Sequence, residues 1–552
     1  MKLLSFSIAL LLCSTLGICQ TSQITNPILS GFHPDPSICR AGNDYYLINS
    51  TFAYFPGLPI YKSSDLVNWK QIGHVLDRPS QLPLQGAWVS GGLYAPTIRY
   101  NNGTFYVVCT LIERGNFIVT TKNPEDGWSE PVYLPEIKGI DPSLFFDDDG
   151  KAYIVHNSSA PNNQPLYEGH STIRLSEFDI VNMKVVGEDK IIVNGGTDIN
   201  KKPRWIEGPH LLKKDGHYYL ICAEGGTEYN HSEVVFQSNT IFGPYTPYEK
   251  NPILTQRTLD RSRKNPITST GHADFVESEN GDWWAVFLGC RPYEDDHYNT
   301  GRETFMAPIQ WKDGWPIVNP DFAEVQYHYP VKTKSAIKSK NDFSGNFSFT
   351  DNFDNDKLNV RYEFLRTPNE KWYNFSDKKG FLSLQLRPQT CGEPANPSFI
   401  GFLQSHLKGS ASTAMNFTAQ TENEKAGLLV FQNDNHYYFL CKSVENNQAV
   451  VQLYQSKGNN SMELIASEKI SDSELQLKIV AKEKTYSFLF STNRNHWVTL
   501  KENVDAKFLS TQTGGGFVGS LYAMYATSNG KMSNNKAYFD WFNYQGDDEV
   551  YK

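Results

Sequence analysis

Short runs of hydrophobic residues follow polar turns at regular intervals through the first 330 residues. Each turn contains Asn, Asp or Gly, and aromatic and aliphatic residues come directly after it. This order predicts β-hairpins. The turns recur roughly 45–65 residues apart, a period typical of four-stranded propeller blades. The pattern therefore predicts a five-bladed β-propeller over residues 24–330, from the runs at 42–48 (GNDYYLI), 101–108 (NNGTFYVV), 148–155 (DDGKAYIV), 214–221 (KDGHYYLI) and 279–287 (ENGDWWAVF).

The pattern changes after residue 330. A Lys- and Ser-rich stretch at 331–350 reads as a linker. From residue 351 to residue 552, short alternating runs return, separated by polar turns, which predicts an antiparallel β-sandwich. Examples are residues 380–388 (GFLSLQLRP), 426–432 (AGLLVFQ) and 449–456 (AVVQLYQS). The expected fold class is all-β, a propeller followed by a sandwich.

The first nineteen residues combine an early Lys with a short apolar run and then small residues. This pattern predicts a signal peptide over residues 1–19 and a periplasmic or secreted protein. A membrane anchor is disfavoured because the apolar run is short for a span, and no later stretch is long enough to be a transmembrane segment. Lipid attachment at Cys19 stays open. The six later cysteines are widely spaced, so we expect buried apolar residues rather than disulfides or a zinc site.

Composition narrows the class of partner. The net charge is −9, which argues against nucleic acid, and aromatic residues make up 13% of the chain. Aromatic faces stack on flat ligands such as sugar rings.

The repeat also aligns residues that could carry chemistry. Eleven or twelve positions before the second aromatic residue of each run lie Asp35, Ala95, Asp141, Glu207 and His272. In a propeller the first strand of each blade lines the central channel. We therefore expect these five side chains to meet at one end of that channel.

The simpler interpretation is that each Asp-Pro pair is a turn at the start of a strand, as a lone Asp-Pro usually is. That interpretation does not explain why three of the five equivalent positions carry a carboxylate. Clustered acids repel one another and cost stability unless they are used. Two carboxyl groups flanking a bond, one protonated and one ionised, are what glycoside hydrolysis requires.

Three segments now resemble the acid motifs of glycoside hydrolase family 43: GFHPDPSICR at 31–40, GIDPSLFFDDDG at 139–150 and WIEGPHLLKKDGHYYL at 205–220. The resemblance implies that Asp35 is the general base and Glu207 the general acid. Asp141 is then the third carboxylate, which raises the pKa of that acid and orients it. It also implies a one-step inverting reaction, with the two catalytic carboxyl groups about 6.5–9.5 Å apart.

The resemblance further implies a sugar pocket around the acids. For the aromatic candidates a core role is the alternative, and for the arginine a surface role. Water or a structural calcium ion is expected near His272, and no cofactor is required. We expect Arg302 and Glu303 to pair structurally, and Asp147, Asp148 and Asp149 to cap a hairpin. The pocket candidates are Arg291, Phe52, Tyr94, Thr227 and His272, with Phe517 from a loop of a concanavalin-like C-terminal module.

These features favour an exo-acting, inverting hydrolase that releases terminal α-L-arabinofuranosyl residues from plant hemicellulose such as arabinoxylan or xyloglucan. A β-D-xylosidase acting on xylo-oligosaccharides, or an enzyme with both activities, is nearly as well supported. Two further alternatives are a retaining fructan hydrolase and a carbohydrate-binding propeller without activity. The expected partner is a plant oligosaccharide or polysaccharide.

Overall fold

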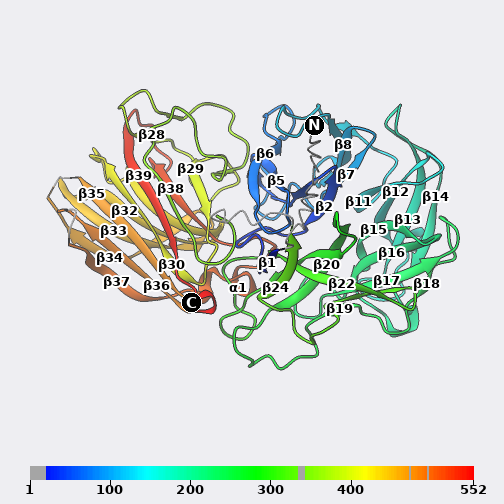
Figure 1. The fold of residues 1–552 in the computed structure, drawn as a ribbon. Coiled ribbons are helices and arrows are strands. Elements are labelled where there is room, and N and C mark those ends of the chain that lie inside the picture. Colours follow the sequence, from blue (N-terminus) through cyan, green and yellow to red (C-terminus); the bar gives the residue numbers. More distant parts are fainter. Residues whose placement is uncertain (1–19, 334–341, 472–473, 494–495) are drawn as a thin grey trace, which may run out of the picture.

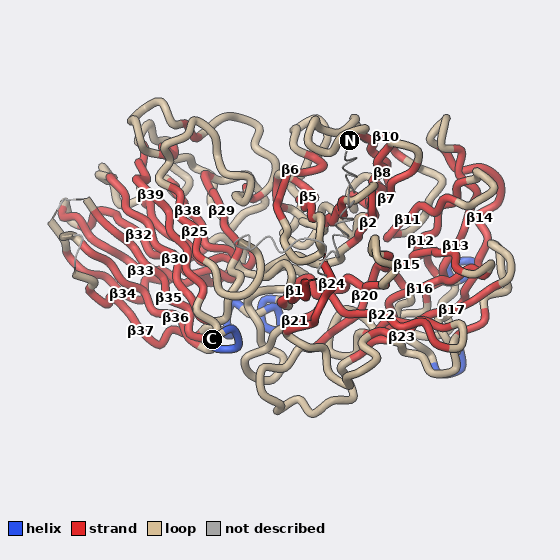
Figure 2. The backbone as a smooth tube through the Cα atoms, in the orientation of Figure 1, coloured by secondary structure: helices blue, strands red, loops and turns tan. Residues whose placement is uncertain are grey.

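The computed structural model of the chain describes residues 20–333, 342–471, 474–493 and 496–552. The expected signal peptide and the middle of the expected linker lie outside these ranges. Strands form almost all of the regular structure (Figure 2). No helix in the described ranges has the length and apolar character needed to cross a membrane. The described helical segments are α1 (Thr511–Gly514) and the 3-10 turns η1 (Pro161–Asn163), η2 (Ile199–Lys201), η3 (Lys507–Leu509) and η4 (Glu549–Tyr551).

The first half of the chain folds into successive antiparallel sheets, coloured blue to green in Figure 1. The first is β2 (Ser37–Ala41), β3 (Asp44–Ile48), β5 (Gly57–Ser63) and β6 (Lys70–Leu76), and the second is β7 (Thr97–Asn101), β8 (Thr104–Leu111), β9 (Gly115–Thr121) and β10 (Val132–Tyr133). The third is β11 (Ile140–Phe146), β12 (Ala152–Ser159), β13 (Ser171–Asp179) and β14 (Lys184–Asn194). The fourth is β15 (Glu207–Lys214), β16 (His217–Glu224), β17 (Ser232–Ser238), β18 (Thr246–Pro247) and β19 (Leu254–Thr255). The fifth is β20 (Thr268–Glu277), β21 (Trp283–Cys290), β22 (Glu303–Lys312) and β23 (Trp315–Val318).

These sheets form a propeller. The first strands contact one another in a closed ring, in the order β2, β7, β11, β15, β20 and back to β2. Each sheet therefore presents its first strand to a common centre. Neighbouring sheets cover each other's faces, so inner strands such as β21 are buried along almost their whole length. Burial on both faces explains why the aromatic runs are nearly continuous in the sequence.

The second half of the chain is a two-sheet sandwich, coloured yellow to red in Figure 1. One sheet holds β27 (Tyr373–Asn374), β28 (Leu382–Gln385), β39 (Lys536–Gly546), β30 (Lys408–Asn416), β35 (Leu475–Lys482), β36 (Thr485–Ser491) and β37 (Val498–Asp505), with β25 (Ser348–Asp351) paired to β39. The other holds β29 (Ser398–Leu403), β38 (Leu521–Thr527), β31 (Lys425–Asn433), β32 (His436–Glu445), β33 (Gln448–Gly458) and β34 (Ser461–Lys469).

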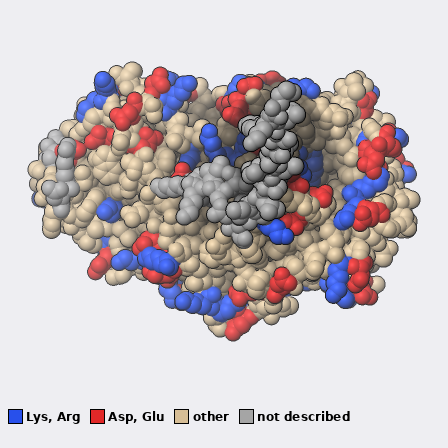
Figure 3. Space-filling model, in the orientation of Figure 1, with Lys and Arg blue, Asp and Glu red and all other residues tan. Residues whose placement is uncertain are grey.

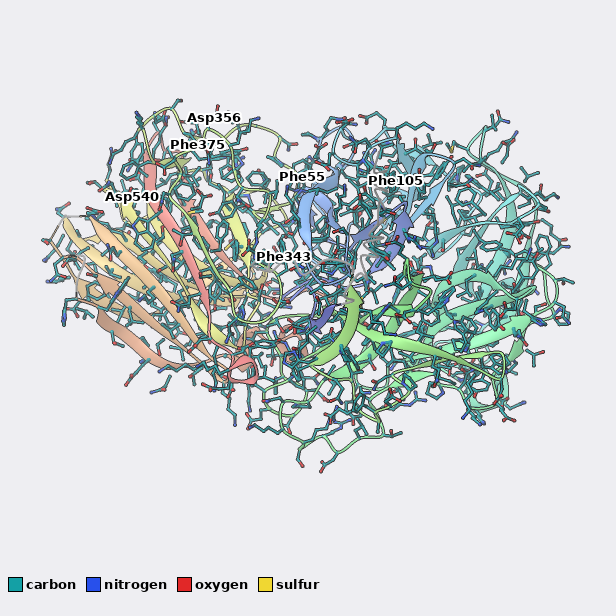
Figure 4. The ribbon with its side chains drawn as sticks, in the orientation of Figure 1. Phe55, Phe105, Phe343, Asp356, Phe375 and Asp540 are labelled. Carbon is teal, nitrogen blue, oxygen red and sulfur yellow. The ribbon has the colours of Figure 1, made fainter. Side chains whose placement is uncertain are left out.

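The two halves share apolar cores rather than meeting at a polar seam. One cluster joins buried side chains of the first two propeller sheets to those of the sandwich. Strand β4 (Tyr54–Phe55) of the propeller pairs with β26 (Phe364–Leu365) of the sandwich, and the rings of Phe55 and Phe364 stack with centroids 6.4 Å apart. Figure 4 shows Phe55 close to the boundary between the two halves. A shared core of this kind resists relative motion of the halves.

Strand β1 (Gln20–Thr25) pairs with β24 (His328–Thr333), which ties the two ends of the first half to each other next to the expected linker. A buried ion pair is a further connection between the two halves. Arg291 of the propeller is buried and donates from Nη1 to Asp548 Oδ2 at 2.7 Å, and from Nη2 to the carbonyl oxygen of Ser405 at 2.9 Å. The carboxylate of Glu303 accepts from Nε and Nη2 of Arg291 at 2.6 and 2.8 Å. A charge buried this completely needs every one of these partners.

Replacement of Asp548 by Ala should therefore destabilise the protein by about 3 kcal/mol, because one nitrogen of a buried guanidinium would lose its acceptor. The change would be measured as the free energy of unfolding in urea. Lys457→Ala is the control, because its ion pair with Glu463 is more than half exposed, and we expect a loss of less than about 1 kcal/mol. Equal effects of the two substitutions would contradict this account of the interface.

Candidate active site

One large cavity opens at the centre of the propeller, with a volume of about 880 Å³. All five positions aligned by the repeat line it: Asp35, Ala95, Asp141, Glu207 and His272. Phe52, Tyr94, Thr227 and Phe517 line it as well. The structure therefore brings together the three acids and most of the pocket residues expected from the sequence.

The backbone at the start of the first strands directs these side chains into the cavity. Asp35, Asp141 and His272 all have positive φ angles, of 51°, 55° and 54°. The pairing register shifts by a bulge next to Asp141 in β11, next to Glu207 in β15 and next to His272 in β20. Bulges of this kind re-aim side chains and are frequent beside active sites. The strained geometry recurs where the chemistry is expected.

Asp35 is held as a carboxylate. Its Oδ1 accepts from Arg302 Nη1 at 2.7 Å, and its Oδ2 accepts from Ser50 Oγ at 2.5 Å. Burial alone would raise the pKa of Asp35, but Arg302, His272 and Ser50 together lower it below the ordinary value. An ionised carboxylate in a cavity can act as a general base.

The pKa values of Asp141 and Glu207 are shifted in the opposite direction. Burial, followed by the charge of Asp35, raises the pKa of Glu207 to about 7. Burial and the neighbouring carboxylates raise the pKa of Asp141 well above its usual range, although Asp141 Oδ2 accepts from the backbone N–H of Gly208 at 3.1 Å. That hydrogen bond ties Asp141 to the residue after Glu207. Two acids with raised pKa values beside one with a lowered pKa are suited to proton donation and proton removal at one site.

His272 completes the ring as a neutral side chain. Its Nδ1 lies 3.8 Å from Asp35 Oδ1, and burial lowers its pKa despite the nearby carboxylate. A neutral imidazole can hold water or a sugar hydroxyl at this point. Within the described residues no group of three or more His, Cys, Asp or Glu side chains is arranged to hold a metal ion.

The arginine of the cavity is Arg302, not Arg291. Arg291 lies outside the cavity, in the buried contact with Glu303 and Asp548. Arg302, which we expected to pair with Glu303, instead binds Asp35 and donates to Thr227 Oγ1 at 3.1 Å. Local sequence did not separate the two arginines, because both lie at an end of an inner strand.

Aromatic rings from both halves of the molecule form one wall of the cavity. Phe517, on a loop of the sandwich, stacks on Phe52 with ring centroids 5.7 Å apart and meets the edge of Tyr94 at 6.1 Å. The guanidinium of Arg302 lies 5.6 Å from the Phe52 ring and 5.7 Å from the Phe517 ring. The backbone N–H of Phe517 donates to Ser90 Oγ at 2.9 Å, which fixes the loop to the propeller.

A second ring of polar side chains fills the channel next to the acids. Asp274 accepts from Arg99 Nη1 and from Ser37 Oγ, both at 2.7 Å. Arg99 Nη2 lies 3.1 Å from His210 Nδ1, and Ser143 Oγ lies 2.9 Å from the same nitrogen. Each of the five first strands contributes one of these residues. We call this set, Ser37, Arg99, Ser143, His210 and Asp274, the channel plug.

Other sequence expectations concern residues away from the cavity. Asp147 accepts from Lys213 Nζ and from Tyr218 OH, both at 2.6 Å, next to the turn after β11. The six cysteines after Cys19 are buried and free of disulfide bonds, as expected.

The sequence analysis missed a further part of the cavity wall. Trp205, Tyr167 and His170 line the cavity on the side of the third sheet. Trp205 lies two positions before Glu207, so its closeness to an acid motif was the available signal. Nothing in the local pattern marked Tyr167 or His170, which belong to the long connection between β12 and β13.

Comparison with known proteins gives two family matches. The model described as Glycosyl hydrolases family 43 matches residues 24–316, and the model described as Beta xylosidase C-terminal Concanavalin A-like domain matches residues 350–545. The chain is 40% identical to "Xylosidase/arabinosidase" of Butyrivibrio fibrisolvens, over 94% of this chain and 98% of that protein. It is 37% identical to "Non-reducing end alpha-L-arabinofuranosidase BoGH43B" of Bacteroides ovatus, over 94% of each chain. The solved structure "Bacteroides ovatus Xyloglucan PUL GH43B" superposes with a TM-score of 0.84 and 36% identity, over 95% of this chain and 99% of that one.

The electrostatics of the cavity predict the effect of removing Arg302. In Arg302→Met the pKa values of Asp35, Asp141 and Glu207 should all rise, because Arg302 lowers each of them. Carboxyl-carbon NMR titration of protein labelled at Asp and Glu would follow the change, with Asp35→Asn used to assign the base. Arg40→Met is the control, since Arg40 lies away from the cavity and its Nε donates to the carbonyl oxygen of Gly42 in its own turn. Unchanged titration curves in Arg302→Met would rule out this account of the carboxylates.

Proposed function

Because the chain belongs to glycoside hydrolase family 43, we propose that it is an exo-acting, inverting glycosidase that releases terminal α-L-arabinofuranosyl residues from plant hemicellulose. The observation that carries the proposal is that two carboxyl groups lining one cavity have pKa values shifted in opposite directions. Asp35 has a lowered pKa, and Glu207 has a pKa raised to about 7. One-step hydrolysis of a glycosidic bond requires one ionised and one protonated carboxyl group.

In the proposed reaction Asp35 removes a proton from a water molecule, and the oxygen of that water forms a bond to the anomeric carbon. Glu207 donates its proton to the glycosidic oxygen as the bond from that oxygen to the anomeric carbon breaks. The products are the free sugar with inverted configuration and the shortened saccharide. Asp141 holds the turn at Gly208 and thereby positions Glu207. We expect the two catalytic carboxyl groups to lie about 6.5–9.5 Å apart, which leaves room for the water.

The remaining cavity residues would bind the sugar. Arg302 takes the role that we first gave to Arg291. Its Nε is buried without a hydrogen-bond partner in the described structure, and such a donor is suited to a sugar hydroxyl. The other proposed sugar contacts are Phe52, Tyr94, Thr227, His272 and Phe517.

Exo action is supported by the channel plug and by the loop of Phe517. The plug fills the channel next to the acids, and the loop covers the cavity from the sandwich side. A polymer could then enter only by an end or a side branch. We further propose that the five sheets of the first domain are five propeller blades, since their first strands close into one ring.

The proposed preference for arabinofuranose over xylose rests on the names of two relatives. The relative in Bacteroides ovatus is named an arabinofuranosidase, and the one in Butyrivibrio fibrisolvens carries both names. A β-D-xylosidase or a bifunctional enzyme is the second candidate, because relatives in Vibrio sp. and Bacillus subtilis are named xylosidases. Arabinoxylan and xyloglucan side chains are the proposed polymers. On the face drawn in Figure 3, acidic and basic side chains are interspersed, which suits a neutral saccharide.

We retain two proposals from the sequence alone. Residues 1–19 are proposed to direct export to the periplasm or the exterior. The domain boundaries are proposed at 24–330 for the propeller and 351–552 for the sandwich, joined by residues 331–350.

The substrate proposal is tested with a panel of nitrophenyl pentosides and defined oligosaccharides of arabinoxylan, xyloglucan and xylan. We expect release of arabinose from non-reducing ends, with the anomer first formed inverted relative to the substrate, as followed by proton NMR. Release of xylose alone would favour the second candidate. A retained configuration would exclude the one-step mechanism and favour the fructan-hydrolase type of reaction.

The role of Glu207 is tested by Glu207→Gln. On an oligosaccharide, kcat should fall by about 100-fold or more, because the leaving oxygen must then depart without a proton. On a pentosyl fluoride, whose leaving group needs no proton, the loss should be much smaller. Equal losses on the two substrates would show that Glu207 is not the general acid.

A further inference from the structure

The cavity is larger than an exo-acting enzyme needs for one terminal sugar. Its volume of about 880 Å³ lies near the upper end of the range for small-molecule sites, about 300–1,000 Å³. The acids and the aromatic wall of Phe52 and Phe517 occupy one side. The other side is formed by the connection between β12 and β13 and by Trp205. This second side is available to the part of the substrate that leaves.

Trp205 is held in an unusual position beside the general acid. Its side chain is 39% exposed, and its φ is +46°, which is rare for a bulky residue. The backbone N–H of Trp205 donates to the carbonyl oxygen of Gly169 at 2.8 Å, so the strained turn is fastened to the third sheet. A ring that stays exposed under such constraint is expected to serve a ligand.

The ring of Trp205 is also held by contacts with Gly226 and Arg204. A Cβ atom at Gly226 would lie 3.1 Å from the ring, which is tighter than most Cβ contacts, and the φ of Gly226 is +77°, so glycine favours this close approach of backbone to ring. The guanidinium of Arg204 stacks over the ring at 4.0 Å and binds Glu168 Oε1 at 3.2 Å. These contacts fix the plane of the ring while part of its surface lines the cavity. A fixed, exposed indole is a stacking surface for a sugar ring.

The cavity wall formed by Tyr167 and His170 is equally well fixed. Tyr167 and His170 stack with ring centroids 5.0 Å apart. The backbone N–H of Leu166 donates to His170 Nδ1 at 3.1 Å, and His170 Nε2 donates to Asn194 Oδ1 at 2.8 Å. Tyr167 OH donates to the carbonyl oxygen of Gly195 at 3.2 Å. The wall is thus formed before any ligand binds.

We propose that Trp205, together with Tyr167 and His170, forms a subsite for the leaving saccharide, with a pyranose ring of that saccharide stacked on Trp205. The inference rests on the proposed function and deepens it. Trp205 and Glu207 share one backbone turn, because Trp205 precedes the acid by two residues and Gly208, at φ +56°, follows it. A sugar on Trp205 therefore places the glycosidic oxygen relative to Glu207, and the subsite selects oligosaccharides over small leaving groups.

The test compares two substrates that differ only in the leaving group. One is an arabinofuranosyl-substituted xylo-oligosaccharide, and the other is arabinofuranosyl fluoride, whose leaving group cannot stack. In Trp205→Ala the ratio of kcat/KM for the oligosaccharide to kcat/KM for the fluoride should fall by about tenfold, the order expected for one lost stacking contact. Trp205→Phe keeps a ring and should restore much of the ratio.

Two further variants complete the design. Tyr100→Ala is the matched control, because Tyr100 is also 39% exposed but does not line the cavity, and the ratio should stay unchanged. Tyr167→Ala changes the wall formed by Tyr167 and His170 without touching the turn before Glu207, so it reports on the subsite if Trp205→Ala does not fold. It should lower the ratio as well.

An equal fall for both substrates in Trp205→Ala, with no change of the ratio in Tyr167→Ala, would overturn the subsite. Trp205 would then act only through the turn that holds Glu207. If the unaltered protein releases arabinose from neither substrate, the proposed function itself fails, and the subsite fails with it. Release from the fluoride with no advantage for the oligosaccharide would overturn the subsite alone.

Discussion

The ion pair between Arg99 and Asp274 joins strands that lie 175 positions apart in the chain. With Ser37, Ser143 and His210 it links the first strand of every propeller sheet at one level of the channel. Three of these residues follow an acid or His272 by only two positions, and His210 follows Glu207 by three. The register that the plug imposes is therefore passed directly to the proposed catalytic groups. Fully partnered polar networks of this kind specify one arrangement of buried groups.

Sequence periodicity located the acids because their positions depend on the hairpins alone. Each blade repeats the distance from strand entry to turn to within one residue, so Asp35, Asp141 and Glu207 could be aligned without coordinates. The cavity contains all five aligned positions. The sandwich could be predicted equally well, since alternating runs and polar turns are local signals in the sequence. The hairpins, the aligned acids and the sandwich strands could therefore be predicted, because each depends on a pattern that repeats along the chain.

Contacts between distant segments could not be predicted in the same way. Arg291 and Arg302 occupy similar local settings, and only the folded structure assigns the first to Asp548 and the second to Asp35. The position of Trp205 depends on a positive φ and on close contact of its ring with Gly226, neither of which a pattern of apolar residues encodes. These features depend on which segments meet, and the repeat carries no information about that.

The pairing of Arg291 also bears on how the protein is made. Ribosomes release the chain from its amino end, and Asp548 follows Arg291 by 257 positions. During synthesis the propeller can close while this guanidinium still lacks two acceptors from the second half, the carboxylate of Asp548 and the carbonyl oxygen of Ser405. The loop of Phe517 is also still absent from the cavity, so a nascent propeller is expected to have an incomplete cavity wall until translation passes Phe517. The order of synthesis thus separates closure of the propeller ring from completion of the aromatic cavity wall.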